Sequence, residues 1–221
     1  MGINAKIAAI SYLNTIPFIY GIRHEGSLCA ELFLAPPSQN VQQFIEGKVD
    51  LALVPAAVVP TLKDAEVITD YCIGAIGAVR TVLIVSNTPI DKVERIWLDA
   101  HSRTSVQLCG YLAKYRWKIA PQWLAMEDYA VMENPQPGDA YLIIGDKCFG
   151  YEGRFAYNYD LAEEWIAQTK LPFVFAFGLL ARVFHTTYTT HWSVLLLLVL
   201  STPTRQYLTA SMLRAIMPTI T

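Results

Sequence analysis

Residues 102 to 105 bring three hydroxyl groups and a guanidinium together in direct succession: Ser102, Arg103, Thr104 and Ser105. The apolar side chains of residues 106–112 are spaced for one face of a helix, so Thr104 and Ser105 stand where that helix should begin. The first N–H groups of a helix, together with its dipole, favour a bound carboxylate or phosphate. A cap needs only one hydroxyl, so this run favours an anion-binding turn, with an ordinary N-cap as the alternative.

Two further groups that could do chemistry lie at the ends of predicted strands. Asn14 follows the strand expected over residues 6–10, and its amide can both donate and accept a hydrogen bond. Asp146 ends the strand expected over residues 140–146, where Gly145 would let a ligand approach the backbone. Open α/β sheets bind their ligands at such carboxyl ends. The alternatives are a turn residue for Asn14, and a helix cap or structural acceptor for Asp146.

These residues need an α/β scaffold to position them, and the hydrophobic pattern predicts one. Strands are expected near residues 6–10, 28–34 and 51–55, with helices near 18–22 and 38–45 between them. Strand and helix alternating at this spacing indicate a parallel, doubly wound sheet.

The chain then changes rhythm, which predicts a second lobe. Residues 67–85 are nearly continuous strand material interrupted by glycines, and we expect them to cross between lobes with Arg80 and Thr81 near the crossing. We expect lobe 1 to comprise residues 1–82 and 177–221, and lobe 2 residues 83–176.

Two local predictions apply inside the second lobe. A short strand is expected near residues 117–119. Asp160, with Glu163 three residues later, predicts the N-cap and third position of a helix.

Composition excludes several classes of protein. Hydrophobic residues make up 53% and charged residues 16% of the chain, which argues against disorder, and a net charge of −2 argues against nucleic acid as a partner. The four cysteines form no C-x-x-C pair, so we expect reduced thiols, a cytoplasmic protein and no metal site. No secretory signal is visible, and the apolar run at residues 194–200 is too short to span a membrane.

Six blocks of sequence, in unbroken order, resemble the chorismate dehydratases, which open the futalosine route to menaquinone. They are Ser-Tyr-Leu-Asn-Thr-Ile-Pro-Phe (11–18), Asp-Leu-Ala-Leu-Val-Pro (50–55), Cys-Ile-Gly-Ala-Ile-Gly-Ala-Val-Arg-Thr-Val (72–82), Leu-Asp-Ala-His-Ser-Arg-Thr-Ser (98–105), Leu-Ile-Ile-Gly-Asp (142–146) and the run from Tyr159 to Ala176. The resemblance implies a two-lobed type 2 periplasmic-binding-protein-like fold, with the ligand in a cleft between the lobes.

The resemblance also implies the site. Asn14 would be the catalytic residue, and the substrate-binding residues would be Thr81, Thr104, Ser105, Ile144, Gly145 and Asp146. Serine is expected at position 81, and threonine keeps the hydroxyl. The expected partner is the small-molecule substrate chorismate, without a cofactor, metal, membrane or nucleic acid; a homodimer is left open.

The implied reaction removes water from chorismate and leaves an aromatic ring. The ring hydrogen beside the enol ether is vinylogous to the ring carboxylate, so donors such as Thr104 and Ser105 would stabilise the developing charge. An amide has no useful basicity, so Asn14 would orient the substrate. The substrate's own side-chain carboxylate is one candidate base, and Asp146 is another.

The tail is where the resemblance ends, because residues 178–221 do not look like the family's closing helices. A frameshift or truncated reading frame is one hypothesis for this tail. Two other functions are compatible with the fold: a solute-binding protein, and the sister enzyme that acts on cyclic dehypoxanthinyl futalosine. A binding protein would be expected to carry an export signal, and the sister enzyme to lack the Ser-Tyr-Leu-Asn block at residues 11–14.

Overall fold

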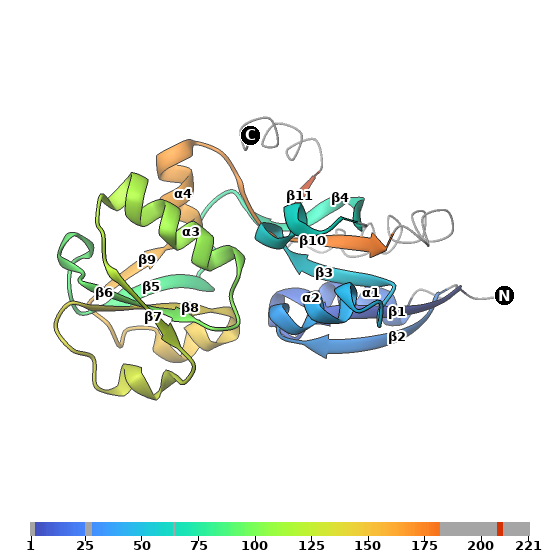
Figure 1. Cartoon of the computed structure of the whole chain (residues 1–221), viewed down its shortest axis with the longest axis horizontal. Coiled ribbons are helices and arrows are strands. Elements are labelled where there is room, and N and C mark those ends of the chain that lie inside the picture. The colour runs from blue at the N-terminus through green and yellow to red at the C-terminus, as the bar shows by residue number, and fades with distance from the viewer. Residues whose placement is uncertain (1–2, 25–27, 64, 182–206, 210–221) are drawn as a thin grey trace. The chain divides into compact units, whose positions relative to one another are not determined.

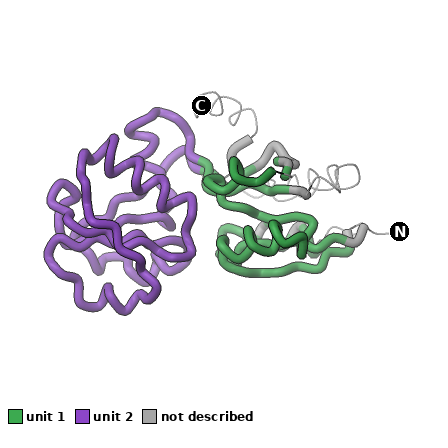
Figure 2. The backbone as a smooth tube through the Cα atoms, in the orientation of Figure 1, with its two compact units in different colours: residues 1–74, 174–221 green, residues 75–173 purple. Residues whose placement is uncertain are grey.

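The computed structural model describes residues 3–24, 28–63, 65–181 and 207–209 (Figure 1). The chain divides into two compact units: unit 1 holds residues 1–74 and 174–221, and unit 2 holds residues 75–173 (Figure 2). Both boundaries fall earlier than the expected ones after residues 82 and 176. Thr81 therefore belongs to unit 2, together with the other five expected substrate-binding residues, whereas Asn14 belongs to unit 1.

Unit 1 is built on a mixed sheet with the strand order β11-β4-β10-β3-β1-β2. Its strands are β1 (Ile3–Ile10), β2 (Leu28–Ala35), β3 (Leu51–Pro55), β4 (Ala65–Ala75), β10 (Phe173–Ala181) and β11 (Tyr207–Thr209). Its helices are α1 (Ile16–His24) and α2 (Pro37–Ile45), with the 3₁₀ segments η1 (Leu13–Thr15) and η2 (Ala56–Thr61). β1 pairs in parallel with β2 and β3, as the alternating pattern predicted, while β10 pairs antiparallel with β3.

The position of β1 explains why its last four residues, 7–10, are all apolar, because helices cover both of its faces there. Ile7 packs in one cluster with Phe18 and Ile22 of α1. Ala8, which points to the other face, packs with Phe44 of α2. A strand buried on both faces needs apolar residues at successive positions. The hypothesis about the tail falls largely on residues 182–206 and 210–221, which lie outside the described residues.

Unit 2 has its own five-stranded sheet, in the order β7-β6-β8-β5-β9. Its strands are β5 (Val82–Ser86), β6 (Arg95–Asp99), β7 (Gln122–Met126), β8 (Asp139–Ile144) and β9 (Tyr157–Asp160). Helices α3 (Thr104–Leu112) and α4 (Leu161–Thr169) lie on one face (Figure 1). The short helical segments are η3 (Ile90–Lys92), η4 (Ala113–Trp117), η5 (Tyr129–Glu133) and η6 (Gly145–Tyr151).

The strand expected near residues 117–119 is wrong. α3 continues into the π-helical turn η4, which ends at Lys118 in the left-handed conformation, with φ 59°. The Trp117 indole N–H donates to Glu164 of α4 at 3.0 Å, and Arg116 pairs with the same carboxylate at 2.9 Å. These contacts hold the side chain of Trp117 against α4. Trp117 is therefore apolar because it packs on a helix, and not because it belongs to a strand.

Strand direction defines one functional edge of the unit 2 sheet. β6 runs parallel to β7 and β8, whereas β5 pairs antiparallel with both β8 and β9. The carboxyl ends of β6, β7, β8 and β9 therefore meet at the edge where β5 begins, which we call the carboxyl edge. No helix among the described residues is both long and apolar enough to cross a membrane.

Candidate functional site at the carboxyl edge of unit 2

Acidic side chains mark the ends of the strands at the carboxyl edge. Asp99 is the last residue of β6, and Asp160 is the last residue of β9. Asp146 lies in the first turn of η6, directly after β8. Asp99 and Asp160 are 1% and 8% exposed, so their charges must be compensated by protein groups.

Thr104 and Ser105 lie at this edge, one and two positions after the N-cap of α3. α3 begins at Thr104, and the N-cap position is held by Arg103, whose side chain makes no capping hydrogen bond. Thr104 and Ser105 are thus the first two residues of the helix, and both are buried. They belong to the first turn of the helix, whose N–H groups have no partner within the helix itself.

Asp99 holds the turn that leads into α3. Its Oδ1 accepts a hydrogen bond from the His101 N–H at 2.7 Å, and its backbone carbonyl accepts one from the Ser102 N–H at 3.1 Å. Its Oδ2 accepts a hydrogen bond from the Tyr129 hydroxyl. The donor-rich turn is therefore fixed by the carboxylate that precedes it.

Lys147 adds a positive charge to the same group of residues. Its Nζ lies 3.9 Å from Asp99 Oδ2 and 4.1 Å from the centre of the Tyr129 ring. Its side chain remains 45% exposed. Sequence reasoning missed Asp99, Tyr129 and Lys147, although a carboxylate that directly ends a buried strand at Asp99 was an available signal.

Thr81, Ile144 and Gly145 meet at the junction of β5 and β8. Val82 is paired with Ile144, and the Gly145 N–H donates to the Thr81 carbonyl oxygen at 2.8 Å. Gly145 has φ 69°, a conformation that glycine adopts without steric cost. Because its N–H is used within the protein, Gly145 can offer a ligand close backbone approach but not that donor.

Asn14 is positioned separately, in unit 1. It lies in η1, after the carboxyl end of β1, and its Oδ1 accepts a hydrogen bond from the Thr15 hydroxyl at 3.2 Å. Thr15 is fully buried, so this contact fixes the orientation of the Asn14 amide. A surface hollow in unit 1, lined in part by Lys6, Lys48 and Asp50, includes none of the predicted site residues.

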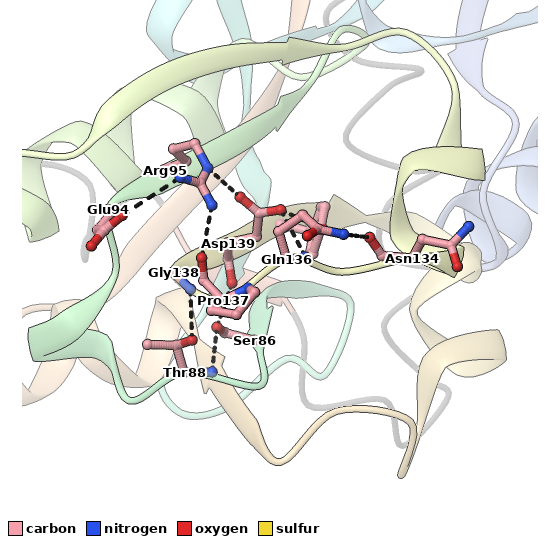
Figure 3. Close-up of polar contacts among 10 residues, drawn as sticks. Ser86, Thr88, Glu94, Arg95, Asn134, Gln136, Pro137, Gly138 and Asp139 are labelled. Atoms are coloured by element: carbon pink, nitrogen blue, oxygen red, sulfur yellow. Dashed lines mark hydrogen bonds and ion pairs between the residues drawn. The ribbon is translucent and has the colours of Figure 1, made fainter.

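The opposite edge of the unit 2 sheet carries a polar cluster with a structural arrangement (Figure 3). Arg95 Nε donates to Asp139 Oδ1 at 2.6 Å, and the same guanidinium donates to the Pro137 carbonyl at 2.7 Å. The Ser86 hydroxyl donates to the Asp139 carbonyl at 2.6 Å. These bonds join the end of β5 to the starts of β6 and β8, away from the predicted substrate-binding residues.

The thiols of Cys109 and Cys148 in unit 2 are expected to be unreactive. Burial raises the pKa of Cys109 and of Cys148 to about 12, so both thiols are neutral at physiological pH. A neutral, buried thiol is a poor nucleophile, and neither is a candidate for covalent catalysis.

Comparison with known protein families decides which family the chain belongs to. Residues 5–196 match the model of the family described as menaquinone biosynthesis. The chain belongs to the menaquinone biosynthesis family. The match encloses all six blocks that suggested this pathway, and it reaches well into the tail expected to depart from the family at residue 178.

Solved structures confirm the fold of this family member. Protein AF1704 from Archaeoglobus fulgidus is similar, with 14% identity and a TM-score of 0.65, over 86% of this chain and 72% of that one. The periplasmic aliphatic sulphonate binding protein SsuA from Escherichia coli shares 14% identity and a TM-score of 0.62, over 90% and 72% of the two chains. The chain has the two-lobed α/β fold of type 2 periplasmic-binding-protein-like proteins, as predicted.

Proposed function

We propose that the chain is a chorismate dehydratase, a hydro-lyase that converts chorismate to 3-(1-carboxyvinyloxy)benzoate and water. The observation that supports this function most is the family match over residues 5–196, which encloses the six blocks resembling that enzyme. The proposal names the reaction, whereas the family names the pathway.

The donors of the carboxyl edge suit a substrate that carries two carboxylates. Thr104 and Ser105 open α3, where the backbone N–H groups and the helix dipole favour an anion. Lys147 contributes a positive charge that Asp99 and the Tyr129 ring hold in place. In this proposal, one carboxylate of chorismate binds at the start of α3.

The chemistry asks the protein mainly to orient the substrate and to handle two protons. Loss of the ring hydrogen spreads negative charge into the ring carboxylate, where Thr104 and Ser105 would stabilise it. The neighbouring hydroxyl leaves as water after it takes up a proton, and the ring becomes aromatic. Asn14 orients the substrate, and either the substrate's side-chain carboxylate or Asp146 takes the ring proton.

The direct test is incubation of the purified chain with chorismate. The expected product is lighter than chorismate by one water and shows aromatic proton signals in its NMR spectrum. A sample without protein controls for spontaneous decay of chorismate. Conversion that does not exceed this control would contradict the proposal.

The two alternative functions are separate arms of the same experiment. Tight binding of chorismate without turnover would favour a solute-binding protein, a role that the SsuA-like fold accommodates. Turnover of cyclic dehypoxanthinyl futalosine in place of chorismate would favour the sister enzyme. The Ser-Tyr-Leu-Asn block at residues 11–14 makes us expect the chorismate reaction.

A further inference from the structure

Asp160 accepts four backbone hydrogen bonds, which is more than its position as a helix cap requires. Its Oδ1 accepts from the N–H groups of Ala162 and Glu163 at 3.0 and 3.2 Å, which is the predicted N-cap of α4. Its Oδ2 accepts from the N–H groups of Val79 and Arg80 at 2.8 and 2.7 Å. Oδ1 therefore accepts from the first N–H groups of α4, whereas Oδ2 holds a loop about eighty residues earlier in the chain.

The loop held by Asp160 has a conformation that needs support. Arg80 has φ 60°, the left-handed region that costs free energy for any residue other than glycine. Asp160 Oδ2 accepts hydrogen bonds from the N–H of Arg80 and from that of Val79, the residue before it. These two bonds stabilise the unfavourable turn. A residue in such a conformation persists only where its surroundings fix it.

The same turn presents Thr81 at the start of β5. The Thr81 carbonyl oxygen accepts the Gly145 N–H at 2.8 Å, which connects the turn to the end of β8. Contacts therefore run from Asp160 through the Val79–Arg80 backbone to Thr81 and on to Gly145. The Thr81 segment and the Gly145 turn, which are both expected to bind substrate, are thus connected to the carboxylate of Asp160.

We propose that Asp160 is a positioning residue for the substrate site, which acts through the N–H groups of Val79 and Arg80 and not only as the cap of α4. This inference rests on the proposed dehydratase function for its activity readout. Asp160 touches no reacting atom in this account. It fixes the backbone from which the Thr81 hydroxyl and the Gly145 turn are presented.

Two substitutions separate the two roles of the carboxylate. Asp160→Ser keeps a good N-cap, but its single, shorter hydroxyl cannot serve the helix and the loop together. Asp160→Ala removes both contacts. We expect the serine variant to melt closer to the wild type than the alanine variant does, while both lose about 100-fold in kcat/KM through misplacement of the site.

The control is Asp139→Asn, which weakens a buried aspartate at the opposite edge of the same sheet (Figure 3). It should lower the melting temperature and leave kcat/KM unchanged at temperatures well below that midpoint. If Asp160→Ser regains wild-type kcat/KM while Asp160→Ala does not, the helix cap explains the whole effect and the positioning role is wrong.

Amide hydrogen exchange tests the positioning independently of the reaction. In Asp160→Ser, the N–H groups of Val79 and Arg80 should exchange faster, while the protection of α4 beyond its first turn is retained. Unchanged exchange at both residues would overturn the inference. A wild-type chain that converts no chorismate would count against the proposed function, and the exchange rates would still decide whether Asp160 holds the turn.

Discussion

Thr104 and Ser105 carry the binding part of the proposal at the scale of single residues. Replacing them together, as Thr104→Val with Ser105→Ala, should weaken binding by roughly 2–4 kcal/mol, because two hydrogen bonds to a charged group are lost. Calorimetric titration with the aromatic product measures this, since the enzyme does not consume it. Thr88→Val, which removes a hydroxyl at the opposite edge, is the matched control. Equal affinities in the folded double variant and the wild type would remove Thr104 and Ser105 from the site.

Asn14 should matter for turnover more than for binding. Asn14→Ala is expected to lower kcat by a larger factor than it raises KM, because an amide that acts on developing charge or on the leaving hydroxyl contributes mainly in the transition state. Steady-state kinetics with chorismate measures both parameters. Asn14→Asp provides the contrast, because it keeps the shape and removes the donor. Equal changes in kcat and KM would reduce Asn14 to a binding contact.

The buried thiols predict how stability responds to alkaline pH. The folded pKa of Cys109 and of Cys148 is raised from the ordinary value of 9.0 to about 12, mainly by burial. Between these values the unfolded chain loses thiol protons that the folded chain keeps. The free energy of unfolding should therefore fall as pH rises above about 9, by up to about 1.4 kcal/mol per pH unit for each thiol. Urea unfolding from pH 8 to 10.5 measures the slope, which Cys109→Ala with Cys148→Ala should reduce.

At the scale of elements, the polar cluster around Asp139, at the opposite edge of the unit 2 sheet, should stabilise that sheet without affecting catalysis. Asp139→Ala removes the acceptor of the Gln136 N–H and leaves the buried Tyr141 hydroxyl without its acceptor. We expect a loss of about 2–3 kcal/mol in the free energy of unfolding. Chemical denaturation gives the number, and kcat/KM measured well below the melting midpoint should stay at the wild-type value. A fall in kcat/KM equal to that of the Asp160 variants would mean that the two edges of the sheet are coupled.

The elements also show which features a sequence can predict. Local signals located β1, β3 and the Asp160 cap of α4, because apolar runs and capping residues act over a few neighbours. The second pair of hydrogen bonds to Asp160 spans about eighty residues, and no local pattern encodes it. For the same reason the sequence did not predict the contact between Asp99 and Tyr129, and it wrongly predicted a strand at Trp117. Strands and caps set by neighbouring residues were therefore predictable, whereas contacts between distant segments were not, and the site residues themselves stay a prediction.

At the scale of the whole molecule, unit 2 should fold without the rest of the chain. All five strands of its sheet, with α3 and α4, come from residues 75–173, so its core needs no segment from unit 1. A fragment of these residues should unfold cooperatively with a free energy of about 5–15 kcal/mol. Urea transitions followed by circular dichroism and by tryptophan fluorescence should coincide. A fragment that shows no cooperative transition would mean that unit 1 is required for the unit 2 core.

The place of β10 has a consequence for how a ribosome can make this protein. β10 lies between β3 and β4 in the unit 1 sheet, although it is synthesised only after all of unit 2. At roughly 5–20 residues per second, the growing chain carries β3 and β4 unjoined for several seconds. Their free edges can pair with other nascent chains during that interval. Soluble yield should therefore depend on translation speed and chaperone supply as well as on the stability of the finished fold.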